Sequence, residues 1–373
     1  MSMTTLRTPK QLCEHGLVPR EQQVMLTTVF TRYAVALPQS LVGLINPADP
    51  FDPIARQIVP DRAELLARPE EFHDPIGDDA HSPVHGVVHR YPDRVLLKIT
   101  HLCAVYCRFC FRRETVGLGK PRTLSSKALA NALEYIRNHP EIWEVILTGG
   151  DPLILSARRL RFVMKSLADI DHVKVVRIHT RVPIADPLHV TRDLVRAMKI
   201  KGKPTYVAVH VNHPRELTTD ARAACARMVD AGIPLLSQTV LLAGINDRPD
   251  VMEELMRALV ECRIKPYYLH HGDLAPGTSH FRTDITVGQQ LTRNLRGRLS
   301  GLCQPTYVLD IPGGHGKSPI ASSYIERAGA TADERFIVED FRGRFHQYPP
   351  LPTNAGLQED PGTPQQPQAS RSR

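Results

Sequence analysis

The stretch Val95-Leu96-Leu97-Lys98-Ile99-Thr100, followed by Cys103-Ala104-Val105-Tyr106-Cys107-Arg108-Phe109-Cys110, decides the fold of this chain. Its first part is mostly apolar and β-branched, which predicts a buried strand. Three cysteines then follow at a three-then-two spacing. Such thiolates can hold one iron–sulfur cluster and leave one iron without a protein ligand. The alternative is structural zinc with His101 as fourth ligand, but the chain has no second Cys-x2-Cys pair.

The strand belongs to a pattern that repeats along the chain. Apolar runs alternate with amphipathic helical segments, which predicts a parallel sheet with right-handed crossovers. Seven strands and about six helices indicate an α/β fold, a partial (β/α) TIM-like barrel whose chemistry lies at the carboxyl ends of the strands. The expected strands are Val95–Ile99, Val145–Leu147, Val173–Ile178, Tyr206–Val211, Leu235–Leu241, Tyr267–Leu269 and Tyr307–Leu309, and the expected helices are Lys127–Arg137, Arg158–Leu167, Val190–Met198, Asp220–Val229, Val251–Val260 and Gln289–Leu299.

The segments on either side of the barrel have a different character. Residues 1–85 predict a helical N-terminal lobe and a linker, because apolar residues recur at helical spacing up to Tyr33 and prolines follow. We expect the barrel to occupy residues 86–330 and a C-terminal extension to occupy residues 331–373. The extension is rich in Pro, Gln and Ser, so we expect disorder from about residue 349.

The composition excludes several classes of protein. The chain has 373 residues, of which 42% are hydrophobic and 23% charged, as in a globular protein. Its net charge of +8 favours anionic ligands, but the basic residues are dispersed, so we expect no direct nucleic-acid binding. No apolar run could span a membrane and no signal sequence begins the chain. Together with seven cysteines, an odd number, this predicts a cytoplasmic protein.

Two glycine-rich segments follow later strands. In Leu147–Pro152, Gly149 and Gly150 would let the backbone approach a ligand closely, and Asp151 could accept a hydrogen bond from an ammonium group. In Val308–Pro319, Lys317 could form a Schiff base with a carbonyl cofactor such as pyridoxal phosphate (PLP). Taken singly, the first could be only a tight turn and the second only an exposed lysine.

The three motifs together resemble the lysine 2,3-aminomutase family of radical S-adenosylmethionine (SAM) enzymes, from about Asp74 to Pro319. The resemblance implies a radical-SAM barrel with three cofactors, namely a [4Fe-4S] cluster, SAM bound to its open iron, and PLP. It implies that Cys103, Cys107 and Cys110 bind the cluster and that Lys317 is the catalytic lysine that binds PLP. Further cofactor contacts implied by it are Arg90, Tyr91 and Arg94 for PLP, and Gly149, Gly150, Asp151, His210 and Gln238 for SAM.

The resemblance also implies the substrate. Arg112 matches an arginine that binds the substrate carboxylate, for which a guanidinium is a suitable bidentate partner. Asp273 and Asp310 match a pair of acids that hold an ε-ammonium group. Together they imply conversion of L-lysine to β-lysine by radical 1,2-amino migration. The alternatives are an aminomutase for another amino acid, such as glutamate, and a non-catalytic module that binds a partner.

Some segments depart from the common pattern. Tyr267–His270 and Cys103–Val105 are closer to the branch that supplies β-lysine for elongation factor P, whereas Asp310–Lys317 follows the free-lysine enzymes. Members with structural zinc have a C-terminal cysteine cluster, but no cysteine follows Cys303 here, so we expect no zinc. The family further implies an electron donor of the flavodoxin or ferredoxin type, and we expect a homo-oligomer.

Overall fold

The computed structural model describes residues 5–117, 119, 122–327 and 335–349. The chain divides into two compact units, Met1–Ser322 and Ser323–Arg373. No helix among the described residues is long and apolar enough to cross a membrane.

The first unit is built on a nine-stranded sheet whose strands pair in their order along the chain. β2 to β8 are parallel, whereas the two end strands β1 and β9 run antiparallel to their neighbours. The predicted α/β partial barrel and its seven parallel strands are therefore confirmed. The strands are β1 (Val87–Tyr91), β2 (Arg94–Thr100), β3 (Glu144–Gly149), β4 (Val175–Thr180), β5 (Thr205–His210), β6 (Leu235–Val240), β7 (Ile264–His270), β8 (Thr306–Ile311) and β9 (Gly316–Pro319).

The two end strands could not be predicted from the sequence, because they are short and lack an apolar pattern of their own. β1 returns into β2 through a tight turn that pairs Tyr91 with Arg94, and β9 follows β8 after only four residues. Connections this short allow only antiparallel pairing. The two end strands meet through a side chain, because the Lys317 N–H donates to the Tyr91 hydroxyl at 2.7 Å. This contact brings Lys317 to the seam of the nearly closed barrel.

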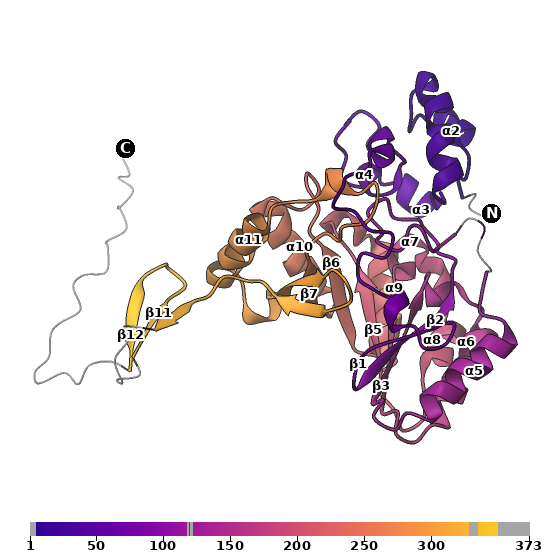
Figure 1. Cartoon of the computed structure of the whole chain (residues 1–373). Helices are drawn as coiled ribbons and strands as arrows, with labels where there is room; N and C mark the ends of the chain where they lie inside the picture. Colours follow the sequence, from indigo (N-terminus) through magenta and orange to yellow (C-terminus); the bar gives the residue numbers. More distant parts are fainter. Residues whose placement is uncertain (1–4, 118, 120–121, 328–334, 350–373) are drawn as a thin grey trace, which may run out of the picture. The chain divides into compact units, whose positions relative to one another are not determined.

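Helices cover the outside of the barrel (Figure 1). Each expected helix is present, because each has an apolar face that packs on the sheet. Most begin at a side-chain cap, for example Ser125 before α5 and Thr218 before α9. These helices are α5 (Ser126–Arg137), α6 (Ala157–Ala168), α8 (Arg192–Met198), α9 (Thr219–Asp230), α10 (Pro249–Glu261) and α11 (Ile285–Arg298), with the short α7 (Val182–Ala185) after β4.

The N-terminal lobe consists of short helices joined by irregular but buried chain. Leu26, Val29 and Tyr33 belong to the same apolar cluster as the barrel strands, so the lobe has no separate core. Its helices are α1 (Pro9–Glu14), α2 (Gln23–Arg32), α3 (Gln39–Val42) and α4 (Ala55–Ile58), followed by a 3-10 turn at Arg62–Leu65. Continuous burial of this kind allows side chains of the lobe to reach the catalytic end of the barrel.

The second unit contains a small antiparallel sheet, which the sequence analysis did not predict. It is formed by β10 (Ile325–Arg327), β11 (Phe336–Glu339) and β12 (Phe345–Tyr348). The disorder expected from about residue 349 lies almost entirely outside the described residues.

Candidate functional site

The three motif cysteines lie together in the loop after β2, here called the cluster loop (residues 101–113). Burial raises the pKa of Cys103 well above its usual value, and the neighbouring Asp151, Cys110 and Cys107 raise it further. Burial and Cys107 raise the pKa of Cys110 to about 11. Within the described residues, no three His, Cys, Asp or Glu side chains converge closely enough for a single metal ion. In an iron–sulfur cluster each cysteine binds its own iron, so a cluster does not require its cysteines to meet at a single metal ion.

The two glycines of the Leu147–Pro152 segment pack directly against the cluster loop. A Cβ on Gly150 would lie 2.2 Å from the carbonyl oxygen of Leu102, and Gly149 has φ +109. Backbone hydrogen bonds join the same segments, from Gly150 N to Thr100 O at 2.6 Å and from Asp151 N to Leu102 O at 2.7 Å. The glycines therefore permit a close approach of two backbones at this end of the barrel.

The Asp151 carboxylate is buried and makes local hydrogen bonds. It accepts from Thr180 Oγ1 at 2.7 Å, and from the backbone N–H groups of Leu153 at 3.0 Å, Arg181 at 2.6 Å and Val182 at 3.1 Å. A carboxylate offers about four acceptor positions, so these four donors occupy them. Asp151 thus ties the end of β3 to the end of β4. Its contact with SAM stays a prediction.

His210 and Gln238 occupy neighbouring positions at the ends of β5 and β6. The His210 ring stacks on Phe109 of the cluster loop, with ring centroids 5.5 Å apart and planes inclined by 15°. Burial lowers the pKa of His210 well below its usual value, and Arg181 and His270 lower it further, so the ring is neutral. The structure therefore brings His210 to the cluster loop, and the register places Gln238 beside it.

A second group of predicted residues converges around Lys317. Lys317 Nζ lies 2.6 Å from Asp310 Oδ1, and Arg90 Nη1 lies 3.9 Å from the same oxygen. His270 Nδ1 lies 3.6 Å from the other Asp310 oxygen. Burial opposes ionisation of Asp310, but hydrogen bonding to His270 and the charge of Lys317 hold its pKa far below the usual range. Asp310 is therefore a carboxylate at neutral pH.

Asp273 has the opposite electrostatic character. Burial raises its pKa to about 7, and the negative charge of Asp310 adds to the rise. Lys317, Arg112 and Arg90 act in the opposite direction, which places all four groups within electrostatic reach of Asp273. The two acids therefore influence each other, and Asp310 ionises at a lower pH than Asp273 does.

Asp78 is a site residue that the sequence analysis did not predict. Its Oδ2 accepts from Arg112 Nε at 3.0 Å and Nη2 at 2.9 Å, and its Oδ1 accepts from Arg90 Nη2 at 3.2 Å. Lys98 Nζ lies 3.8 Å away. Burial opposes ionisation, but Arg112 and Lys98 lower the pKa of Asp78. In the sequence Asp78 resembles any turn aspartate, because its cations come from three other segments.

Two buried nitrogen atoms at this site have no hydrogen-bond partner among the described residues, namely Arg90 Nε and His179 Nε2. Burial, followed by the charges of Arg177 and Lys317, lowers the pKa of His179 far below its usual value. Buried polar atoms are usually paired, so these two nitrogen atoms are available to a polar ligand. Arg94 is more peripheral: its side chain is 34% exposed, pairs with Asp93 at 2.7 Å and stacks on Tyr91 at 4.0 Å.

Comparison with known proteins identifies the family of this chain. Residues 97–257 match the model of the radical SAM superfamily, and residues 292–368 match the model for lysine-2,3-aminomutase. The chain is 38% identical over 343 residues to the L-lysine 2,3-aminomutase of Clostridium subterminale, which covers 92% of this chain and 81% of that protein. The chain belongs to the lysine 2,3-aminomutase family. It is an aminomutase, and the radical SAM family implies an iron–sulfur cluster and SAM.

Two further relatives of this aminomutase are named for different substrates. The L-lysine 2,3-aminomutase of Acetoanaerobium sticklandii is 42% identical over 332 residues, covering 89% of this chain and 79% of that protein. The glutamate 2,3-aminomutase of Clostridioides difficile is 36% identical over 311 residues, covering 83% of this chain and 73% of that protein. Overall identity therefore establishes the family of aminomutases without separating a cationic from an anionic substrate.

Arg181 is a second residue of the aminomutase site that the sequence analysis missed. Its Nη1 lies 2.8 Å from Cys107 Sγ, and its Nη2 donates to Glu216 at 2.7 Å and to Gln57 at 2.8 Å. Burial alone would lower the pKa of Arg181, but the charges of Cys107 and Glu216 raise it. If Cys107 binds the cluster, this permanent cation would stabilise the more negative, reduced state of the cluster.

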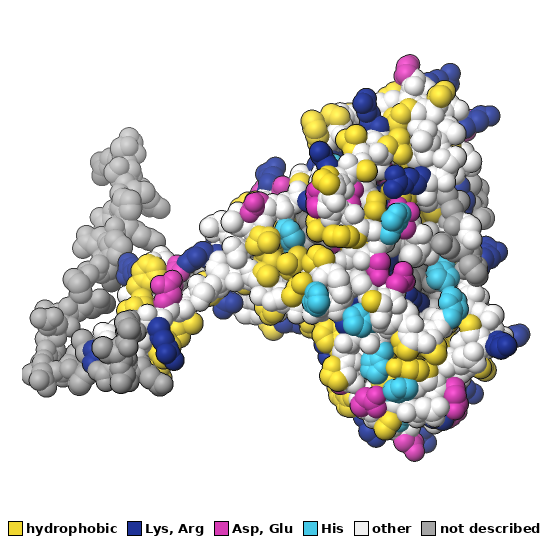
Figure 2. Space-filling model, viewed as in Figure 1, with side chains coloured by type: hydrophobic (Ala, Val, Ile, Leu, Met, Phe, Trp, Pro, Cys, Tyr) yellow, Lys and Arg dark blue, Asp and Glu magenta, His cyan; other side chains and the backbone are white. Residues whose placement is uncertain are grey.

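The surface of the aminomutase agrees with the charge pattern in its sequence. Figure 2 shows Lys and Arg side chains spread over the face in view rather than gathered in one patch. Histidine side chains lie closer together on the same face of the main unit.

Proposed function

We propose that this aminomutase is an L-lysine 2,3-aminomutase, which moves the α-amino group of L-lysine to its β-carbon. The observations that support the proposal are the electrostatic influence of Asp310 and Arg112 on the buried Asp273 carboxyl group and the 2.6 Å contact between Asp310 and Lys317. Two acids provide partners for an ε-ammonium group, and a guanidinium provides one for a carboxylate. Glutamate would place a second carboxylate against those acids.

PLP is the proposed second organic cofactor, and the residues around Lys317 suit it. The Nε of Arg90 has no hydrogen-bond partner among the described residues, and its guanidinium group offers a cation for a phosphate. A Cβ on Gly316 would lie 2.8 Å from the Tyr91 hydroxyl, so only glycine allows this close approach beside Lys317. When bound, the cluster and SAM would supply a radical that abstracts hydrogen, and PLP would supply a ring that delocalises the unpaired electron during nitrogen migration.

The surroundings of Asp310 suit a further cation. In this structure Asp310 accepts from the Lys317 ammonium group, and Arg90 and His270 lie 3.9 and 3.6 Å from its oxygens. Lys317 would hold the carbonyl group of PLP, while Asp310 would hold the ε-ammonium group of the substrate. Such a contact is favourable because a buried charge requires partners of opposite charge.

Arg112 can bind a substrate carboxylate without leaving Asp78. Asp78 occupies its Nε and Nη2, while Nη1 makes only a 3.4 Å contact with Thr148 Oγ1. A guanidinium has five N–H donors in a rigid plane, so donors remain available. The Asp78 pair would fix the orientation of that plane.

The test is anaerobic reconstitution with iron, sulfide, SAM, PLP and a reductant, followed by chromatographic separation of β-lysine from lysine. We expect β-lysine to form and glutamate to remain unchanged. Failure to convert lysine with an intact cluster would refute the proposal, and faster conversion of glutamate would support the second substrate. Lys317→Ala should abolish the visible absorbance of bound PLP and leave the iron content unchanged.

A narrower proposal concerns the use of the product. The resemblance of Tyr267–His270 to the elongation factor P branch supports a role of the β-lysine in modifying that factor. Deletion of the gene should then remove the β-lysyl mass from elongation factor P, as measured by mass spectrometry of the intact factor. An unchanged mass would assign the β-lysine to another use.

A further inference from the structure

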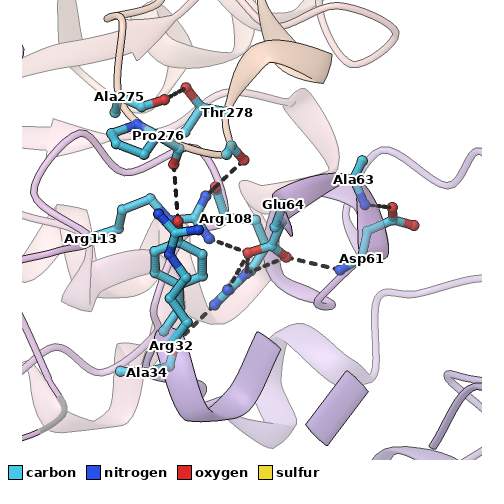
Figure 3. A network of polar contacts seen from close by, with 12 residues as sticks. Arg32, Ala34, Asp61, Ala63, Glu64, Arg108, Arg113, Ala275, Pro276 and Thr278 are labelled. Atoms are coloured by element: carbon cyan, nitrogen blue, oxygen red, sulfur yellow. Dashed lines mark hydrogen bonds and ion pairs between the residues drawn. The ribbon is translucent and has the colours of Figure 1, made fainter. Parts of the chain in front are cut away.

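Glu64 of the N-terminal lobe lies at the centre of a buried ionic network (Figure 3). Its side chain is 0% exposed and accepts from Arg108 Nε at 3.0 and 3.1 Å through its two oxygens. Arg113 forms an ion pair with the same carboxylate. The backbone N–H of Asp61 also donates to Glu64, at 2.8 Å. One buried carboxylate therefore holds two buried guanidinium groups.

Both arginines belong to the cluster loop. Arg108 lies between Cys107 and Cys110, and Arg113 lies three residues after Cys110. Arg108 makes further contacts to the N-terminal lobe: Nη1 donates to Ala34 O at 2.8 Å, and its backbone N–H donates to Gln57 O at 2.9 Å. These hydrogen bonds attach the N-terminal lobe to the part of the cluster loop that carries Cys107 and Cys110.

Arg113 extends the network to the loop at residues 271–278, here called the Asp273 loop. Its Nη1 donates to the carbonyl oxygen of Gly277 at 3.0 Å (Figure 3). A Cβ on Gly277 would lie 2.2 Å from the backbone oxygen of Glu64, so the loop packs directly on the Glu64 backbone. Arg113 also stacks on Tyr33 at 3.6 Å. Glu64 is therefore the shared partner of the cluster loop and the Asp273 loop.

The two buried guanidinium groups need the negative charge of Glu64. Burial would raise the pKa of Glu64, but Arg108 and Arg113 lower it, so the group is ionised. Without the carboxylate, two guanidinium groups would lie close together with no counter-charge, away from water. Loss of one partner from a buried ionic group is unfavourable, because the remaining charges are left uncompensated. The two loops would then separate or rearrange.

We propose that Glu64 is a positioning residue that fixes the cluster loop and the Asp273 loop relative to each other. This arrangement sets the separation between the source of the radical and the acid that receives the substrate ammonium group. The second half of the inference rests on the proposed lysine aminomutase function. The two arginines have different roles in this network. The Arg108 side chain joins the cluster loop to the N-terminal lobe, whereas the Arg113 side chain also contacts the Asp273 loop.

The test compares Glu64→Gln, Arg108→Gln and Arg113→Gln with Asp52→Asn in the reconstituted full-length enzyme. Asp52 is a matched control, because its buried carboxylate in the same lobe pairs with Arg215 and contacts neither loop. The readouts are the melting temperature, the iron content, the electron paramagnetic resonance spectrum of the reduced cluster with and without SAM, and kcat and KM for lysine.

We expect Glu64→Gln to alter the SAM-induced spectral change and to raise KM for lysine by on the order of tenfold to a hundredfold, since small displacements at a reacting site have effects of this size. Arg113→Gln should also alter the SAM-induced spectral change and raise KM for lysine. Arg108→Gln should alter the SAM-induced spectral change but leave KM for lysine within about twofold of the control. If Glu64→Gln changes only the melting temperature, as Asp52→Asn does, the proposal is overturned.

These variants also distinguish the role of Glu64 from the identity of the substrate. If Glu64→Gln does not fold, the contrast between Arg113→Gln and Arg108→Gln tests the same network, and equal KM values in these two variants would overturn it. If the wild-type protein binds SAM but does not convert lysine, the lysine proposal fails. The spectral comparison then still decides whether Glu64 positions the cluster loop.

Discussion

Asp273 should give lysine turnover a defined pH dependence. Its pKa is raised to about 7 by burial and by Asp310, so the carboxylate is about one-tenth ionised at about pH 6 and about nine-tenths ionised at about pH 8. The substrate ε-ammonium group, with a pKa of about 10.4, stays charged over this interval. If the ionised acid binds that group, kcat/KM for lysine should rise about tenfold from pH 6 to pH 8.

The variant Asp273→Asn isolates this effect. A hydrogen bond to a charged group contributes about 1.5–3 kcal/mol, so the variant should lose about tenfold to a hundredfold in kcat/KM at pH 8. At pH 6 the loss should be smaller, because the wild-type acid is already mostly neutral. The ratio of the wild-type and variant values should therefore change about tenfold across the interval.

The assay is the initial rate of β-lysine formation by the reconstituted enzyme at five pH values, with cluster content measured at each. Any titration of the substrate α-amine affects both proteins equally and cancels in the ratio. A ratio that stays constant from pH 6 to pH 8 would refute the role of Asp273. Stability gives an independent check with a defined sign: the native state retains a proton that the unfolded state releases, so this acid lowers the unfolding free energy as pH rises from about 4 to about 7.

Two other substitutions test the packing and the charge beside the cluster loop. Gly150→Ala places a Cβ 2.2 Å from Leu102 O and should lower the unfolding free energy by about 1–3 kcal/mol, whereas Gly301→Ala, which meets nothing within 4 Å, should be neutral in the same thermal melt. A loss in both variants would contradict the proposed contact. Arg181→Gln removes a cation 2.8 Å from Cys107 Sγ and should lower the midpoint potential of the cluster, as measured by redox titration. A tenfold decrease in the ratio of reduced to oxidised cluster corresponds to a shift of about 59 mV. Arg181→Lys should retain most of the wild-type potential, and an unchanged potential in Arg181→Gln would contradict the electrostatic role.

The barrel is predictable from the sequence, but its two end strands are not. Parallel strands such as β3 and β5 are recognisable because their apolar runs lie between amphipathic helices, and both patterns are local. β1 and β9 hold only a few residues each and depend on a neighbouring strand for their conformation. A short polar segment that pairs with a strand resembles a loop until the partner is known.

The candidate site shows the same division. Cys103, Cys107, Cys110 and Lys317 could be proposed from the sequence because they stand in distinctive motifs, and the structure places the cysteines in the loop after β2 and Lys317 at the start of β9. Asp78, by contrast, is one acid in an ordinary turn. Only the fold gives it Arg90, Lys98 and Arg112 as partners.

The sequence by itself thus determined the class of fold, because strands and helices have local periodicities, and it indicated the family through the resemblance of its motifs. Tertiary structure decided which charges face one another. The pairing of Glu64 with Arg108 and Arg113, and of Arg181 with Cys107, joins residues that are 44 to 74 positions apart in the sequence. Electrostatic interactions depend on distance in space and on exclusion of water, and neither can be read from separation along the chain.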